Sequence, residues 1–425
     1  FLILILNLVY LNTVQADQFN FDVTEIEIYN KGNLYKGLKR GTITTDDGII
    51  IKANTFIYNK ITNIVDAEGN VIVEDTINNY VLFSDTAKYK RNEEIVIAEG
   101  NSKGIDDKNR TITSDKLTYN KITNIVYAEG NVITKDMAKD YIIETEKLIY
   151  TINEEKILTE GFTEANIESE YNIKSENVTY LLDTKQLISK NKSTIKDGNN
   201  QIYYLDEFIF FVNSNLVKGK NILTITNFNL PKSDKYFFTD GMFNLKNKTF
   251  TAKDTKVDVY KEIFNDERND PRIYGASSKG DESSTIVRKG VFTICQKRDG
   301  CPPWSIKSPE IKHDRIKKQI EYRHAILKVY DVPVFYFPKF FHPDPTVKRQ
   351  SGFLIPKFQD NSSTGLSFNL PYFLAIAENK DLTLTPRFFN DDKFLIQSEF
   401  RQKNRNSNHI ADVSQFVSGG KNSKS

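Results

Sequence analysis

A repeat of about thirty residues runs through the first half of the chain and limits its possible folds more than any other feature. Residues 53–75 read ANTFIYNKITNIVDAEGNVIVED, and residues 114–136 read SDKLTYNKITNIVYAEGNVITKD. A unit this short cannot bury an apolar face alone, so neighbouring units must stack into a continuous structure. A glycine recurs at positions 69, 100, 130 and 161, and an aromatic side chain recurs at Tyr58, Tyr89, Tyr119, Tyr150, Tyr180 and Phe210.

Each unit contains two segments in which apolar and polar residues alternate, a pattern typical of half-buried β-strands. The glycine of each Glu-Gly-Asn triplet predicts a bulge or a bend. We therefore predict an all-β structure whose stacked sheet folds over on itself around an apolar lining. Periodicity does not distinguish a packed core from an open groove. The candidate lining residues are Phe56, Tyr58, Val65, Ala67, Tyr89, Leu117, Tyr119, Val126, Leu148, Tyr150, Tyr180 and Phe210.

Composition excludes two classes of protein. Lysine and arginine, 58 together, nearly equal the 56 aspartates and glutamates and are interspersed with them, which leaves no basic face for nucleic acid. No internal stretch reaches the roughly 20 apolar residues that a membrane-spanning helix needs. The 21 tyrosines and 29 phenylalanines, against 2 methionines and 1 tryptophan, favour sheet over helix.

The first residues predict export. An apolar run at 1–11 is followed by polar residues and by Val14-Gln15-Ala16, which has the pattern of a signal-peptidase site. We expect residues 1–16 to be a signal peptide that is truncated at its start, because initiator methionine and basic residues are missing. The alternative is a hydrophobic first strand. Export permits disulfides, and the two cysteines, Cys295 and Cys301, are a candidate pair.

The sequence contains few residues in patterns typical of catalytic or metal sites. The four histidines have no metal-ligand spacing with cysteine or with one another, and the usual hydrolase and nucleotide motifs are missing, so we predict no metal site, no cofactor and no enzyme activity. The repeated glutamates could form a carboxylate ladder that binds calcium or cleaves a polysaccharide. Like charges at strand spacing repel, so a solvated face is the simpler interpretation. These glutamates are Glu68, Glu99, Glu129 and Glu160.

The second half resembles a known family. The runs CPPWSIKSPEIKHD (301–314), VPVFY (332–336), KRQSGFLIP (348–356) and LPYF (370–373) are similar to the LptD family, also called OstA or organic solvent tolerance protein. The resemblance is weak in the repeats and strong from Cys301 onward. It implies a periplasmic β-jellyroll of OstA/LptA-like repeats followed by the first strands of an outer-membrane β-barrel. It also implies that Pro356 and Pro371 loosen the barrel seam, since proline lacks the N–H of a ladder bond.

The family resemblance further implies partners and a location. They are lipopolysaccharide, a plug lipoprotein like LptE, periplasmic bridge proteins like LptA and LptC, and the Gram-negative outer membrane with the N-terminal domain in the periplasm. Cys301 resembles a family cysteine that pairs near the end of the barrel, so Cys295 is either its local partner or part of a second bridge.

The expected domains follow from these patterns. They are the repeat jellyroll at 17–265, its end and connection at 266–350, and a barrel start at 351–425, which is too short for a large barrel and indicates a fragment. Within 351–425 we predict strands at 352–358, 365–373, 381–389 and 394–402.

Three functions fit this sequence. The leading hypothesis is lipopolysaccharide transport and assembly, in which acyl chains move through an apolar groove into a barrel. The alternatives are a carbohydrate-active β-solenoid enzyme and a surface adhesin or scaffold with a packed core.

Overall fold

The computed structural model describes residues 19–136, 138, 140–225, 234–259, 270–297, 302–344, 347, 349–354, 356–361, 365–389 and 393–418. Within these ranges the chain forms β-strands and two short 3-10 turns, η1 (Asn30–Gly32) and η2 (Val212–Ser214), so the predicted all-β class is confirmed. None of the helical turns in the described residues could cross a membrane. The predicted signal peptide, 1–16, and Cys301 lie outside the described residues.

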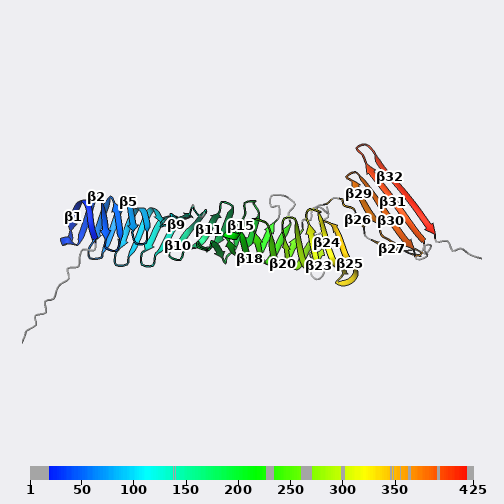
Figure 1. The fold of residues 1–425 in the computed structure, drawn as a ribbon, viewed down its shortest axis with the longest axis horizontal. Helices are drawn as coiled ribbons and strands as arrows, with labels where there is room; N and C mark the ends of the chain where they lie inside the picture. Colours follow the sequence, from blue (N-terminus) through cyan, green and yellow to red (C-terminus); the bar gives the residue numbers. More distant parts are fainter. Residues whose placement is uncertain are drawn as a thin grey trace, which may run out of the picture. The chain divides into compact units, whose positions relative to one another are not determined.

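The chain divides into two compact units, Phe1–Lys253 and Asp254–Ser425. In the first unit, shown in blue to green in Figure 1, the paired strands are antiparallel, and the long strands between residues 64 and 167 follow one another in chain order. The strands of this unit are β1 (Phe19–Tyr29), β2 (Leu34–Thr45), β3 (Ile49–Ala53), β4 (Thr55–Asn59), β5 (Ile64–Asp75), β6 (Tyr80–Lys90), β7 (Ile95–Ile105), β8 (Thr111–Asn120), β9 (Ile125–Asp136), β10 (Tyr141–Thr151), β11 (Lys156–Ile167), β12 (Tyr171–Glu176), β13 (Thr179–Leu181), β14 (Gln186–Ser189), β15 (Ser193–Lys196), β16 (Ile202–Leu205), β17 (Glu207–Phe211), β18 (Leu216–Ile225) and β19 (Lys235–Asn244), and β20 (Phe250–Asp258) crosses the boundary.

The predicted bend at each Glu-Gly-Asn triplet is confirmed. The pairing of β7 with β8 slips in register between Glu99 and Ser102, and Gly100 there has a φ of +78°. At the equivalent Gly130, a Cβ atom would lie 2.4 Å from Asp115 Oδ2, so a larger residue would clash as well as strain the backbone. The bend therefore needs glycine, and it recurs because the repeat recurs.

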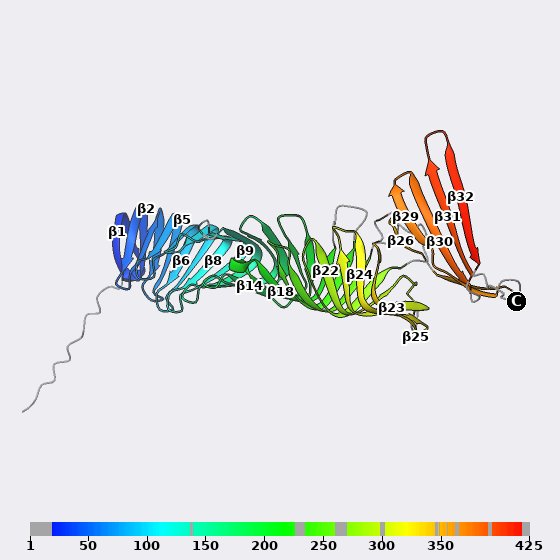
Figure 2. The ribbon, with the colours of Figure 1, turned by 45° about the vertical axis from the view of Figure 1, so that its right-hand side comes forward.

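The bend divides each long strand into two stretches, which we call arm A and arm B. In β5 and β6, for example, residues 64–68 and 86–90 form arm A, and residues 71–75 and 80–84 form arm B. Figure 2 shows these long strands side by side in the blue and cyan part of the ribbon. The unit is therefore one sheet folded along a line of glycine bends.

Inward side chains of the two arms pack against each other. Aromatic rings meet across the arms at centroid distances of 4.9 Å for Tyr80 and Tyr119, and 5.2 Å for Tyr141 and Tyr180. Further along the unit, Tyr171 lies 5.2 Å from Phe210. Such tilted and edge-on ring pairs stabilise a core beyond the area that they bury. The interior of the first unit is thus closed by aromatic contacts.

The second unit contains strands of two sheets. From the first come the antiparallel neighbours β21 (Arg272–Gly280), β22 (Ser284–Thr293), β23 (Trp304–Asp314), β24 (Gln319–Val329) and β25 (Val332–Pro343). The second is seven-stranded and antiparallel, with β26 (Gly352–Phe353), β27 (Lys357–Asn361), β28 (Gly365–Asn369), β29 (Tyr372–Ala377), β30 (Lys380–Phe389), β31 (Lys393–Lys403) and β32 (Asn408–Ser418).

Two of the four strands predicted in 351–425 were wrong in extent. The predicted strand at 365–373 is two strands, β28 and β29, which are separated at Leu370 and Pro371. The strand predicted at 352–358 likewise ends at Phe353 and resumes as β27 after Pro356. The physical reason is the same in both places, because a proline has no N–H to donate to the ladder. The other two predictions match β30 and β31 closely.

Candidate functional site

The twelve candidate lining residues all point into the first unit. Every one is buried, and the most exposed, Tyr58, shows only 6% of its surface. All twelve lie in arm A, as the pairing of Phe56 with Ala67 and of Tyr119 with Val126 illustrates. They form a continuous apolar surface along the unit, and in this structure that surface faces arm B.

Arm B supplies the opposite half of the lining, and none of its residues is among the predicted lining positions. The sequence did contain a sign of these residues, because a tyrosine recurs at the start of arm B in several units. Its buried apolar residues include Ile43, Ile51, Val73, Tyr80, Leu82, Ile112, Val132, Tyr141, Ile143, Tyr171, Ile173 and Tyr203. The candidate site is therefore a two-sided interior.

The recurring tyrosines reach across the interior to aspartates of the other arm. The hydroxyl of Tyr119 in arm A donates to Asp75 Oδ2 at 2.8 Å, at the end of arm B. Tyr89 donates to Asp47 and Tyr150 to Asp106 in the same way, each at 2.9 Å. Basic side chains from the adjoining turns form ion pairs with Asp47 and Asp106. We call this row the polar seam, and it consists of Asp47, Asp75, Asp106, Tyr89, Tyr119, Tyr150, Arg91, Arg110 and Lys121.

Asp47 is the most heavily contacted carboxylate of the polar seam. Arg91 Nη1 lies 3.0 Å and Lys121 Nζ 3.3 Å from its Oδ2. Burial pulls the pKa of Asp47 upward, but hydrogen bonds from Thr45 and Tyr89 and the charges of Arg91 and Lys121 outweigh it, so the pKa lies below its usual value. Burial, followed by the Asp47 charge, raises the pKa of Tyr89 far above 10, so this hydroxyl remains a donor.

Acid is expected to weaken this part of the polar seam. A carboxylate whose pKa is lowered on folding contributes stability that is present above its unfolded pKa of about 3.9 and is lost as the pH falls through the lower folded value. The free energy of unfolding, measured with urea, should therefore fall more steeply between about pH 5 and pH 2 for the native chain than for Asp47→Asn. Parallel pH curves for the two proteins would contradict this assignment.

The most enclosed ion pair of the polar seam joins Asp106 and Arg110. Arg110 Nε donates to Asp106 Oδ2 at 2.6 Å, and the two side chains are only 3% and 2% exposed. The guanidinium also lies over the ring of Tyr150, 5.3 Å from its centroid. Buried charges of this kind need their partner, because water cannot reach them.

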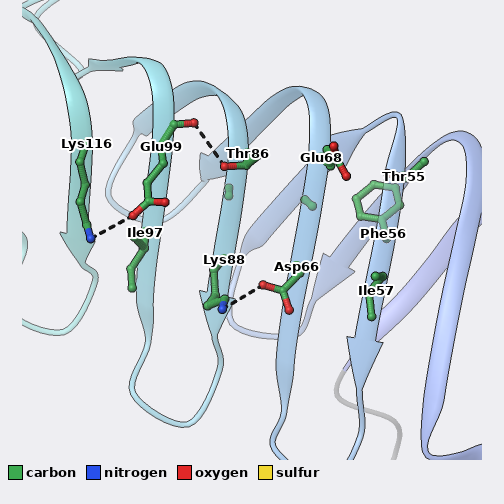
Figure 3. A pocket seen from close by; sticks show the side chains of 12 residues that line it. Thr55, Phe56, Ile57, Asp66, Glu68, Thr86, Lys88, Ile97, Glu99 and Lys116 are labelled. Carbon is green, nitrogen blue, oxygen red and sulfur yellow. Dashed lines mark hydrogen bonds and ion pairs between the residues drawn. The ribbon is translucent and has the colours of Figure 1, made fainter.

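The outer face of arm A has a different chemistry. Outward side chains of this face line most of a hollow of about 360 Å³. Figure 3 shows two ion pairs there, Lys88 with Asp66 and Lys116 with Glu99. The Glu99 carboxylate is 2.9 Å from the ammonium and about half exposed, and Glu129 pairs with Lys147 at 3.2 Å in the next unit. Glu99 and Glu129 are thus solvated members of charge pairs.

Other candidate residues lie in the second unit. Pro356 is exposed and precedes β27, whereas Pro371 is half-buried and its carbonyl accepts the N–H of Leu354 at 2.8 Å. Cys295 is half-buried, and its disulfide stays a prediction because Cys301 lies outside the described residues. Among the residues described, no group of three or more His, Cys, Asp or Glu side chains could hold a metal ion.

The fold and its interior define a class: β-repeat proteins whose bent hairpins enclose an apolar interior. Comparison with known families narrows this class. A model described as "OstA-like protein" matches residues 19–141, and one described as "LptD protein" matches residues 320–407. The predicted resemblance is confirmed, and the chain is related to the LptD family.

Individual relatives agree. "LPS-assembly protein LptD" of Yersinia enterocolitica is 38% identical over 152 residues, which are 35% of this chain and 19% of that protein. The protein of the same name from Pectobacterium atrosepticum is 31% identical over 234 residues, covering 49% and 28%. That of Escherichia coli O1:K1 / APEC is 38% identical over 124 residues, covering 29% and 15%. The matched part of this chain spans less than a third of each relative.

Proposed function

We propose that this chain takes part in lipopolysaccharide transport and assembly at the outer membrane, and that the interior of its first unit receives the acyl chains. The observation that carries the proposal is the apolar lining of both arms in a chain whose relatives are named LPS-assembly proteins. No covalent step is needed. Each acyl methylene removed from water contributes about 0.8 kcal/mol, and similar successive repeats would let a chain slide from one unit to the next.

The rest of the proposal concerns location and partners. The repeat domain, 17–265, would lie in the periplasm and receive lipid from bridge proteins like LptA and LptC. Residues 266–350 would connect it to a barrel that begins at 351–425 and is plugged by a lipoprotein like LptE. The breaks at Pro356 and Pro371 support a loosely paired edge through which lipid would leave, because both interrupt a strand.

Photo-crosslinking tests the central step. A benzophenone amino acid at Tyr119 or Val126, which are buried inside, is expected to capture lipopolysaccharide because acyl chains would lie against these positions. The matched control is Thr118, which precedes Tyr119 on β8 and points to the other face of the sheet. Capture is measured by immunoblotting for lipopolysaccharide on the purified chain. Equal capture at Thr118 would contradict the interior route.

A further inference from the structure

We propose that the first unit opens along the polar seam, with the glycine bends as hinges, and that acyl chains enter its interior only while the seam is parted. This inference rests on the proposed function and adds to it the point of entry. Its starting observation is that every lining residue named above is buried in the closed arrangement. A lipid therefore has to separate the two arms before it can contact arm A.

The contacts across the seam differ in kind from those within each arm. Within an arm, neighbouring turns are joined by backbone hydrogen bonds, such as Lys121 N to Glu94 O at 3.0 Å in arm A and Thr76 N to Gly48 O at 3.0 Å in arm B. Across the seam, the hydrogen bonds of Tyr119 and Tyr150 come from side chains alone. Parting the seam thus breaks side-chain contacts and leaves both backbone ladders intact.

The same kind of closure continues toward the end of the first unit. Lys185 lies 3.8 Å from Glu168, and the hydroxyl of Tyr171 donates to Asn215 at 2.9 Å. Lys248 forms an ion pair with Asp197. Each contact joins a turn or strand end of arm A to one of arm B, so the closure recurs with the repeat and can part unit by unit.

The bends are suited to act as hinges. At each one the ladder slips by a residue, which leaves fewer backbone hydrogen bonds to resist a change of angle. Gly100 and Gly130, both at a φ of +78°, have no side chain to limit the backbone there. The two arms can therefore swing about this line with little disturbance of either ladder.

The closed arrangement also leaves several buried polar atoms of the described residues without a hydrogen-bond partner. The hydroxyl of Tyr80 is buried between the arms with no hydrogen-bond partner among the described residues, and it lies directly over Gly104. An unpaired buried hydroxyl disfavours the closed state, whereas exposure of rings such as Tyr80 and Tyr119 to water disfavours the empty open state. Acyl chains between the arms would cover those rings, so the two states are balanced in a way that lipid can shift.

A bridge across the seam tests the inference directly. Asn78 in an arm B turn and Asn124 in an arm A turn both contact the hydroxyl of Tyr119, at 3.1 and 3.2 Å. In a full-length chain with both native cysteines replaced by serine, Asn78→Cys and Asn124→Cys joined by a short bis-maleimide should prevent lipopolysaccharide capture by the photo-crosslinker at Val126. The matched control joins Asn124→Cys to Asn153→Cys, because Asn153 lies 2.8 Å from Asn124 within arm A.

The possible outcomes distinguish entry through the seam from the proposed lipopolysaccharide transport. Capture in the control bridge together with loss in the cross-seam bridge supports entry through the seam. Equal capture in both bridged proteins overturns the seam inference and leaves the transport proposal standing. Absence of capture in the unbridged chain overturns both.

Weakening the seam provides a second measurement. Tyr119→Phe with Tyr150→Phe removes the hydroxyls that bond across the seam to Asp75, Asn78 and Asp106 but keeps the rings. Asp75 retains the backbone N–H groups of Ile77 and Asn78. Capture at Val126 should become about tenfold faster, the effect of roughly 1.4 kcal/mol. Tyr127→Phe, on an outward residue that is 42% exposed, is the control and should leave the rate unchanged. A slower or unchanged rate in the double variant would overturn the inference.

Discussion

Replacing Phe210 with alanine is expected to lower the free energy of unfolding of the repeat unit by about 3 to 5 kcal/mol. The Phe210 side chain is fully buried in arm A of β17 and meets Tyr171 of arm B at 5.2 Å. Its removal loses the transfer free energy of the ring and leaves a cavity that close-packed neighbours fill only in part. The loss is measured by urea unfolding of the full chain, followed by far-UV circular dichroism.

Phe162→Ala is the control for this variant. Phe162 is on β11 and 57% exposed, so its truncation should change stability by no more than about 0.5 kcal/mol. Equal effects of the two substitutions would show that the arms do not pack as described. Because each repeat contacts mainly its neighbours, loss at one unit can also appear as an earlier partial transition.

Replacing Arg110 with methionine is expected to cost a similar amount, about 3 to 5 kcal/mol, for an electrostatic reason. Asp106 would keep the hydrogen bond from Tyr150 but would lose its guanidinium partner while only 2% of its side chain is exposed. A buried carboxylate without a cation is strongly destabilising, whatever the net contribution of the original pair.

The double variant Asp106→Asn with Arg110→Met separates charge from packing. An amide oxygen can still accept from Tyr150, and no unpaired charge remains, so the double variant should be more stable than Arg110→Met alone. The same urea unfolding measures all three proteins. A double variant as unstable as the single one would indicate that Arg110 acts through packing over the Tyr150 ring rather than through its charge.

Much of the fold was predictable because the repeat displays its strand pattern several times over. Val65 and Ala67 alternate with Asp66 and Glu68, and the glycine that follows marks the bend. Arm B was harder to recognise as lining, because polar residues such as Ser84 and Ser114 occupy some of its buried positions next to the bend. These serines can be buried because their hydroxyls donate hydrogen bonds to nearby backbone carbonyls. A search for alternating apolar residues does not detect such positions.

The polar seam could not be predicted from the sequence for a geometric reason. Tyr119 and Asp75 are 44 positions apart, and their contact depends on the angle at which each strand bends. Periodicity fixes which face a tyrosine occupies but not what its hydroxyl reaches. The strand breaks at Pro356 and Pro371 were instead foreseeable, since proline within a strand pattern argues against a continuous strand.

Because the repeats stack along one direction, the length of the first unit is proportional to the number of repeats. Each repeat inserts two neighbouring strands, and strands in a sheet are about 4.8 Å apart, so one repeat lengthens the enclosed path by roughly 10 Å. Because three successive units close with their own tyrosine and aspartate, residues of a whole repeat could be added or removed there without a new kind of contact. The length of the enclosed interior can thus be set by copy number alone.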